Sequence, residues 1–179
     1  STSFNDFIRY ERDLSNLMHD WSFGQGSGRN FYGDYFKVKV DEDYSDEFQA
    51  DNLVTNANAY LKASFAGRVE DNGRNYSITA NGTKFTSGTF GRTQGGSVDT
   101  YAYQQVIEAE FIPGGPFEIL LEFNKGSSSF NEGWLDYLQL NFRRELLMTG
   151  DQMIFRDVET IGNGASLFSM GNASESIEI

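Results

Sequence analysis

The sequence predicts an all-β domain: a jelly-roll-like β-sandwich with roughly eight to ten antiparallel strands. Three observations predict it. Apolar and polar residues alternate along several short segments, turn-forming residues separate those segments, and no stretch shows the apolar spacing of an amphipathic helix. The chain has 179 residues, which is the size of one domain, and we treat residues 1–179 as a single sandwich.

The first part of the chain, residues 1–34, is predicted to be an extension or loop that packs on the sandwich. Its segment 3–12 is compatible with a strand and with a single helical turn, and both remain open. Residues 20–36 combine glycines with aromatic side chains. Because glycine adopts backbone angles that other residues avoid, and aromatic rings anchor a loop by their burial, we expect an ordered loop there.

The strands themselves are predicted from alternation, which places the apolar side chains of a half-buried strand on one face. The segments that alternate are 35–40, 58–66, 75–81, 105–111, 117–124 and 134–148, and shorter candidates lie at 152–156, 166–170 and 176–179. In the first segment Phe36, Val38 and Val40 should face the core. Between Ile78–Ala80 and Thr83–Phe85, Asn81-Gly82 is the dipeptide of a two-residue hairpin turn.

The charge of the chain argues against two classes of partner. Fourteen Lys and Arg residues face 26 Asp and Glu residues, for a net charge of -12. A nucleic-acid-binding protein needs a basic surface, and the densest basic point here is the pair Arg143 and Arg144, which we expect in structural ion pairs. No apolar run approaches the ~18 residues that span a bilayer. We therefore predict no nucleic-acid partner and no direct membrane insertion.

The chain is predicted to have no catalytic residues and no cofactor of its own. It contains no cysteine, which excludes a thiolate nucleophile and a Cys-ligated zinc site within it. His19 is the only histidine and lies outside any nucleophile-elbow pattern, so we interpret it as a packing or surface residue. A hydrolase with paired carboxylates is a further interpretation, but Glu108, Glu110 and Glu122 fall on the polar faces of predicted strands.

The densest acidic run, residues 41–47, is predicted to be a loop. Calcium prefers several hard oxygen ligands on a loop, and the candidate ligands are Asp41, Asp43, Asp46 and Glu47. The run lacks the glycine and the closing glutamate of an EF-hand. A structural calcium ion and a solvated acidic loop both remain open.

Aromatic residues form the second candidate site, a surface for a ligand or a partner. Aromatic faces suit the apolar faces of sugar rings, whereas buried rings seal the ends of a sandwich. The candidates are Trp21, Phe31, Tyr32, Tyr101 and Tyr103. On this basis a carbohydrate-binding module of an exported bacterial protein is the alternative function.

Two stretches carry a family resemblance. The first is GSGRNFYGDYF at residues 26–36, and the second is WLDYLQLNFRR at 134–144, followed by QMIFRD at 152–157. They are similar to an S/G-G-R-x-W/F-x-G-E/D-x-F element and to a W-L-x-Y-x-x-L-N-Y/F-x-R-x-L element. Both elements precede the peptidase domain of PorU-type proteins, the C-terminal-signal peptidases (sortases) of the Bacteroidetes type IX secretion system. The second match is the more specific one.

The resemblance implies a role for the chain. In this gingipain-like cysteine peptidase family the catalytic Cys and His belong to the peptidase domain that follows, so no catalytic residue is carried over. The chain is then a non-catalytic accessory domain of an exported protein at the cell surface, associated with the outer membrane or extracellular. Its expected partners are the downstream domain of the same polypeptide and secretion-system proteins or cargo. Residues 176–179 resemble an interrupted strand, so we expect the parent protein to continue beyond Ile179.

Overall fold

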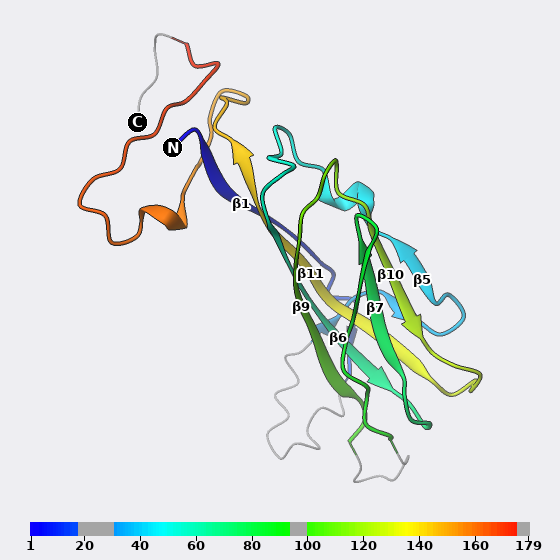
Figure 1. Ribbon diagram of the computed structural model, residues 1–179. Coiled ribbons are helices and arrows are strands. Elements are labelled where there is room, and N and C mark those ends of the chain that lie inside the picture. Colours follow the sequence, from blue (N-terminus) through cyan, green and yellow to red (C-terminus); the bar gives the residue numbers. More distant parts are fainter. Residues whose placement is uncertain (18–30, 94–99, 175–179) are drawn as a thin grey trace.

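The computed structural model describes residues 1–17, 31–93 and 100–174 of the chain. Two antiparallel sheets form the predicted sandwich (Figure 1). The larger sheet has the order β1 (Ser3–Glu11), β11 (Glu132–Glu145), β6 (Ala59–Arg68) and β9 (Tyr103–Phe111), and β4 (Tyr35–Phe36) pairs with the start of β11. The smaller sheet has the order β5 (Asp41–Asp43), β10 (Ile119–Asn124), β7 (Asn75–Ala80) and β8 (Thr83–Thr86).

The order of these strands confirms the jelly roll. Leaving aside β4, the two sheets contain β1 and β5 to β11, eight strands in all. Numbered along the chain, the larger sheet holds the first, eighth, third and sixth of them, and the smaller sheet holds the second, seventh, fourth and fifth. This is the arrangement of two Greek keys in a double-sheet jelly roll. The described residues also form a small β2 (Ser15–Asn16) and β3 (Phe31–Tyr32) pair and two 3-10 helices, η2 (Ser45–Phe48) and η3 (Val158–Thr160).

The core lies between the sheets, where the alternation places the apolar residues. On β6, Leu61 and Phe65 are buried, whereas Tyr60 and Lys62 point to solvent. The segments 75–81, 105–111 and 117–124 likewise bury their apolar sets. Ser64 and Ala66 are exceptions on β6, because both are buried although they lie on the outer face of the sheet. The hairpin turn is also confirmed, since Asn81 and Gly82 both have positive φ and connect β7 to β8.

The centre of the core is a stack of three aromatic rings. Tyr76 lies between Phe65 and Phe123, with ring-centroid distances of 4.3 Å and 4.7 Å. The tyrosine is fully buried, and within the described part of the chain its hydroxyl has no hydrogen-bond partner. A Cβ atom at Gly133 would lie 2.3 Å from that hydroxyl oxygen. Glycine is therefore required at this point of β11 because the ring approaches its backbone so closely.

A β-bulge on β11 changes which side chains face outward. The register with β6 shifts between Leu135 and Tyr137, which leaves Asp136 without an opposite residue. Beyond the bulge Leu138 faces the core, and before it Leu135 does so while Trp134 faces the outside of the sheet. Simple alternation along 134–148 did not predict this change.

The N-terminal extension is more integrated than predicted. Residues 3–11 are not a helical turn but β1, an edge strand that pairs with β11 over its whole length. Beyond β1 the chain does pack on the outside of the larger sheet, where Leu17 and Tyr32 contact Trp134 and Ala66. This outer packing explains how residues on the far side of a sheet become buried.

Four sequence predictions differ from the structure. The strand expected at 35–40 ends at Phe36, because the chain then crosses to the other sheet, and Val38 is 97% exposed. The acidic residues 41–43, expected in a loop, form the edge strand β5. Segments 152–156 and 166–170 are not strands, although Arg156 makes an isolated bridge to Asn5. Segment 176–179 lies outside the described residues.

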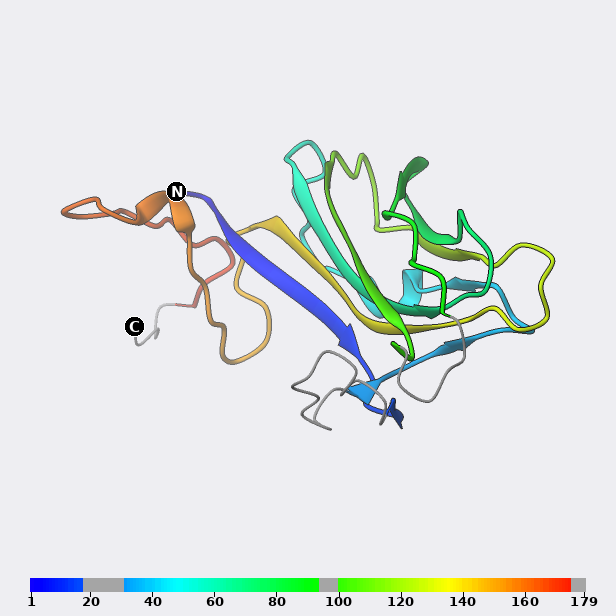
Figure 2. The ribbon, with the colours of Figure 1, turned by 90° about the horizontal axis from the view of Figure 1, so that it is seen from below.

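Residues 146–174, which we call the arm, leave the sandwich at the end of β11. In Figures 1 and 2 the arm (orange to red) extends beyond the end of both sheets, beside the N-terminus of the chain. It is almost without regular structure, with η3 as its one short helical element in the described residues. No helix in the described ranges is long and apolar enough to cross a membrane.

Candidate partner-binding surfaces

Two of the five predicted aromatic residues, Tyr32 and Tyr101, lie in a cluster around Trp134 on the outside of the larger sheet. The ring of Tyr35 lies 5.4 Å from it and that of Tyr101 lies 6.4 Å from it, tilted by 37° and 40°. Tyr32 packs on the same tryptophan. Trp134 is consequently only 5% exposed, whereas Tyr35 keeps 47% of its surface exposed. The cluster is a small second core with one accessible tyrosine, and its rings are not coplanar.

The other predicted aromatic residues lie elsewhere. Phe31 is on β3 and its side chain is partly open to solvent. Tyr103 starts β9 and packs against the main core from its edge, close to Gly91. Trp21 and His19 lie outside the described residues. Of the five candidates, the structure therefore brings Tyr32 and Tyr101 together.

A buried carboxylate lies beside the aromatic cluster. Glu132, at the start of β11, accepts a hydrogen bond of 2.5 Å from the Tyr35 hydroxyl and forms ion pairs with Lys37 at 3.2 Å and Arg68 at 3.4 Å. Arg68 also stacks on the ring of Tyr101, 4.5 Å from its centroid. Burial, and then the bond to Glu132, raise the pKa of Tyr35. The two cations and the tyrosine satisfy the carboxylate, so this group stabilises the surface and is not positioned as a general acid.

A second carboxylate, that of Asp34, links the two sheets through hydrogen bonds from one tyrosine on each side. Asp34 accepts hydrogen bonds from the hydroxyls of Tyr10 at 2.7 Å and Tyr44 at 2.8 Å, and pairs with Arg12 at 3.2 Å. Burial is the first cause, and the bond to Asp34 the second, of the raised pKa of each tyrosine. We did not predict this cluster from the sequence. The signal was available, since Asp34 stands in the first of the two stretches with a family resemblance.

The predicted calcium ligands do not converge. Asp41 and Asp43 lie on the edge strand β5 with exposed side chains, while Asp46 and Glu47 lie on η2. Asp43 instead accepts hydrogen bonds from the hydroxyl and then the backbone amide of Ser45, which lower its pKa. Within residues 1–17, 31–93 and 100–174, no group of three or more His, Cys, Asp or Glu side chains is arranged to hold a metal ion. Calcium binding stays a prediction without support from the geometry.

A buried ion pair fastens the arm to the sandwich. Arg143 donates two hydrogen bonds, of 3.1 Å and 2.8 Å, to the carboxylate of Asp157, whose side chain is 1% exposed. Arg143 also donates to the hydroxyl of Ser3. The hydrogen bonding of Arg143 to Asp157 is the first cause of the lowered pKa of Asp157. The neighbouring Arg144 pairs with Asp6 at 2.8 Å. The expectation that both arginines form structural ion pairs is confirmed, with the buried acid on the arm.

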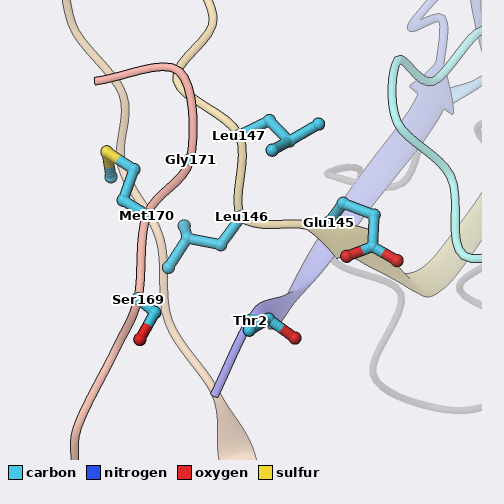
Figure 3. A pocket seen from close by; sticks show the side chains of 7 residues that line it. All are labelled: Thr2, Glu145, Leu146, Leu147, Ser169, Met170 and Gly171. Atoms are coloured by element: carbon cyan, nitrogen blue, oxygen red, sulfur yellow. The ribbon is translucent and has the colours of Figure 1, made fainter. Parts of the chain in front are cut away.

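A pocket of about 300 Å³ lies where the arm returns to the end of β11 (Figure 3). Its lining is formed by Thr2, Glu145, Leu146, Leu147, Ser169, Met170 and Gly171. Gly171 permits the close contact, because a Cβ atom there would be 2.6 Å from a methyl carbon of Leu147. Backbone hydrogen bonds of 2.9 Å join this glycine to Leu146 and Met148 on either side of that leucine. This pocket could not be predicted from the sequence, because it is formed by segments distant along the chain.

Comparisons with known proteins relate the fold to solved structures. No protein-family model and no curated protein matches the sequence. The CBM36-1 domain of a multidomain xylanase from the hindgut metagenome of Trinervitermes trinervoides aligns with 76% of this chain and 95% of its own, at a TM-score of 0.39 and 10% identity. CBM35 from Cellvibrio japonicus Abf62 aligns with 79% of this chain and 96% of its own, at a TM-score of 0.36 and 13% identity. At these TM-scores neither similarity carries an argument.

The structural similarity to PorU is higher than that to the two carbohydrate-binding modules. Dimeric latent PorU from Porphyromonas gingivalis matches 90% of this chain at a TM-score of 0.69 and 17% sequence identity. This chain spans only 15% of the length of that PorU chain. At this identity the likeness establishes the fold. The resemblance found in the sequence is therefore confirmed at the level of structure: this chain has the fold of a β-sandwich segment of PorU.

Proposed function

We propose that this chain is a non-catalytic accessory β-sandwich domain of a larger, exported PorU-like protein, where it packs on a neighbouring domain and positions partners or cargo for type IX secretion. The observation that carries the proposal is the match of 90% of the chain to a 15% portion of PorU. A fold that recurs as a small part of a long chain is typical of a domain within a multidomain protein. Catalysis would then belong to another part of that protein.

The surface chemistry supports this proposal. The carboxylates that the described fold buries, Glu132 and Asp157, are satisfied by cations and hydroxyls, so they stabilise structure. The arm displays large apolar side chains that the sandwich does not cover. Interfaces between the domains of one chain bury surfaces of this kind.

The test starts with the coding sequence next to the codon of Ile179. We expect it to encode a gingipain-like domain with a catalytic Cys and His. The purified chain alone should then show no peptidase turnover, whereas the full-length protein should show it. A stop codon there, a glycoside hydrolase domain, or peptidase turnover by the isolated chain would each contradict the proposal.

Carbohydrate binding is the second candidate, and one observation favours it. Tyr35 keeps 47% of its surface exposed beside Glu132, Lys37 and Arg68, which is the combination of an aromatic side chain and polar groups that sugars require. The tilt of the neighbouring rings and the burial of Trp134 limit the platform to that one residue. Affinity electrophoresis on soluble polysaccharides, with Tyr35→Ala beside the unchanged protein, tests this. Retardation that Tyr35→Ala abolishes would support the candidate, and equal mobility with and without polysaccharide would rule it out for those glycans.

A further inference from the structure

The arm presents an unusual concentration of exposed apolar side chains. Ile154, Val158, Ile161 and Leu167 are between 60% and 86% exposed. Single exposed apolar residues are normal on a protein surface, but several on one short segment mark a site of interaction. The apolar side chains that the sandwich itself exposes, such as Val38, belong to separate loops and strands.

The arm is also held in place, which a flexible tail would not be. The ion pair between Arg143 and Asp157 fastens its middle. Beside it, the amide of Asn5 donates to the carbonyl of Arg156 at 2.8 Å, and the amide of Val158 donates to the side chain of Asn5 at 3.0 Å. These contacts fix the backbone on both sides of Asp157. The exposed side chains are therefore presented in a defined arrangement, which lowers the entropic cost of docking.

Aromatic packing supports the same arrangement. The ring of Phe155 contacts Phe4 of β1 at 6.5 Å and Phe168 of the returning part of the arm at 5.2 Å. Farther along, Ser169 donates its amide to the carbonyl of Ser1. The arm thus folds back on itself and on the start of β1, so Ile161 and Leu167 are held away from the sandwich rather than buried against it.

Acidic side chains outnumber basic ones on the arm, where Asp151, Asp157 and Glu159 stand against Arg156. Asp157 is neutralised by Arg143, and Arg156 stacks on the ring of Phe7, 4.9 Å from its centroid. Glu159, which lies 3.6 Å from Arg143, keeps 74% of its side chain exposed, and Asp151 is exposed as well, so these two acids outnumber the exposed Arg156. Because like charges repel at an interface, this surface selects a partner that carries Lys or Arg next to apolar side chains.

The pocket at the base of the arm extends this selection to one side chain. The pocket has a volume of about 300 Å³. Its lining includes the apolar side chains of Leu147 and Met170 and the carboxylate-bearing side chain of Glu145 (Figure 3). A lysine or arginine combines an aliphatic stem that packs on such residues with a charged end that pairs with a carboxylate. A basic side chain is therefore the occupant that fits both parts of the lining.

From these observations we infer that the arm is the docking surface for a neighbouring domain of the same polypeptide, and that the docked surface is apolar with Lys or Arg at its margin. This inference rests on the proposed function, because it supposes a multidomain parent. It adds the location of the contact and the chemistry of the partner. The sandwich faces, including the cluster around Trp134, take no part in it.

Site-specific photo-cross-linking in the full-length protein tests the inference. A benzophenone amino acid replaces Leu167 in one variant, Ile161 in a second, and Val38 in a matched control, because Val38 is an exposed apolar residue of the sandwich. We expect the two arm variants to cross-link to another segment of the same polypeptide with a yield about fivefold or more above the control. Mass spectrometry should place the cross-link within a few residues of a Lys or Arg.

Charge reversal tests the chemistry of the partner. Asp151→Lys should lower the cross-linking yield from Leu167 about threefold, whereas Asp41→Lys on the distant strand β5 should leave it unchanged. Equal yields from the arm and from Val38, cross-links to a different protein, or no response to Asp151→Lys would each overturn the inference. If Val38 alone links to the rest of the polypeptide, the arm inference fails while the accessory-domain proposal stands. If the gene encodes no further domain, the proposal itself fails.

Discussion

The close approach of Tyr76 to Gly133 allows the packing of the core to be tested by a double-mutant cycle. In Gly133→Ala the new methyl carbon would lie 2.3 Å from the tyrosine hydroxyl and 3.0 Å from the ring carbon that bears it. The ring has no room to move aside, because Phe65 and Phe123 stack on its two faces. Overpacking of a tight core costs about 1–3 kcal/mol, and we expect the upper half of that range here. For a chain of this size that corresponds to a fall in Tm of about 4–12 °C.

The partner substitution removes the atom that causes the clash. Tyr76→Phe deletes a buried hydroxyl that has no partner among the described residues, so we expect stability within about 1 kcal/mol of the unchanged protein, or above it. In the double variant the hydroxyl clash is gone, but the 3.0 Å contact to the ring remains. The double variant should therefore recover about half of the loss caused by Gly133→Ala, a coupling energy of about 1 kcal/mol or more.

Urea unfolding followed by tryptophan fluorescence and by circular dichroism measures all four proteins, and the two signals check that unfolding is two-state. A loss of more than about 1.5 kcal/mol in Tyr76→Phe would show that the hydroxyl has a partner after all, such as a bound water. Strictly additive effects would show that the two residues do not touch. Either result would refute the reasoning.

Three further predictions follow from the structure. Phe142→Ala should destabilise the fold by about 3–5 kcal/mol, because its side chain is buried in the core, and a loss below about 1 kcal/mol in a urea titration would contradict its placement. Asp157→Asn should raise the rate of limited proteolysis of the arm at least about tenfold and leave the melting temperature of the sandwich nearly unchanged, since the arm can detach alone. The pKa of Asp157 is lowered by its hydrogen bonding to Arg143. The contribution of this ion pair to the stability of the arm is therefore fully present above the usual pKa of Asp, and it is lost as the pH falls through the lowered pKa. Hydrogen exchange of the arm should thus rise below about pH 4 in the unchanged protein, and Asp157→Asn should show no such step.

Much of the candidate site was beyond prediction, and particular residues show why. The Asp34 cluster joins side chains from β1, from the loop before β4 and from the residue before η2, and their sequence order gives no sign of that meeting. The stretch 41–43 reads as a solvated loop because a short edge strand is open to water and needs no apolar alternation. The burial of Trp134 depends on rings that come from other parts of the chain. The two arginines were predicted to form ion pairs, but their partners were not.

The sequence by itself determined the period-two strands, the all-β class and the turn at Asn81-Gly82. It could do so because each of these depends on neighbouring residues: side chains alternate across a strand, and a tight turn needs residues that tolerate positive φ. Only the tertiary structure decided the bulge at Asp136, the glycine required at Gly133 and the anchoring of the arm through Asp157. These depend on contacts between segments far apart along the chain, and such contacts exist only once the two sheets have packed.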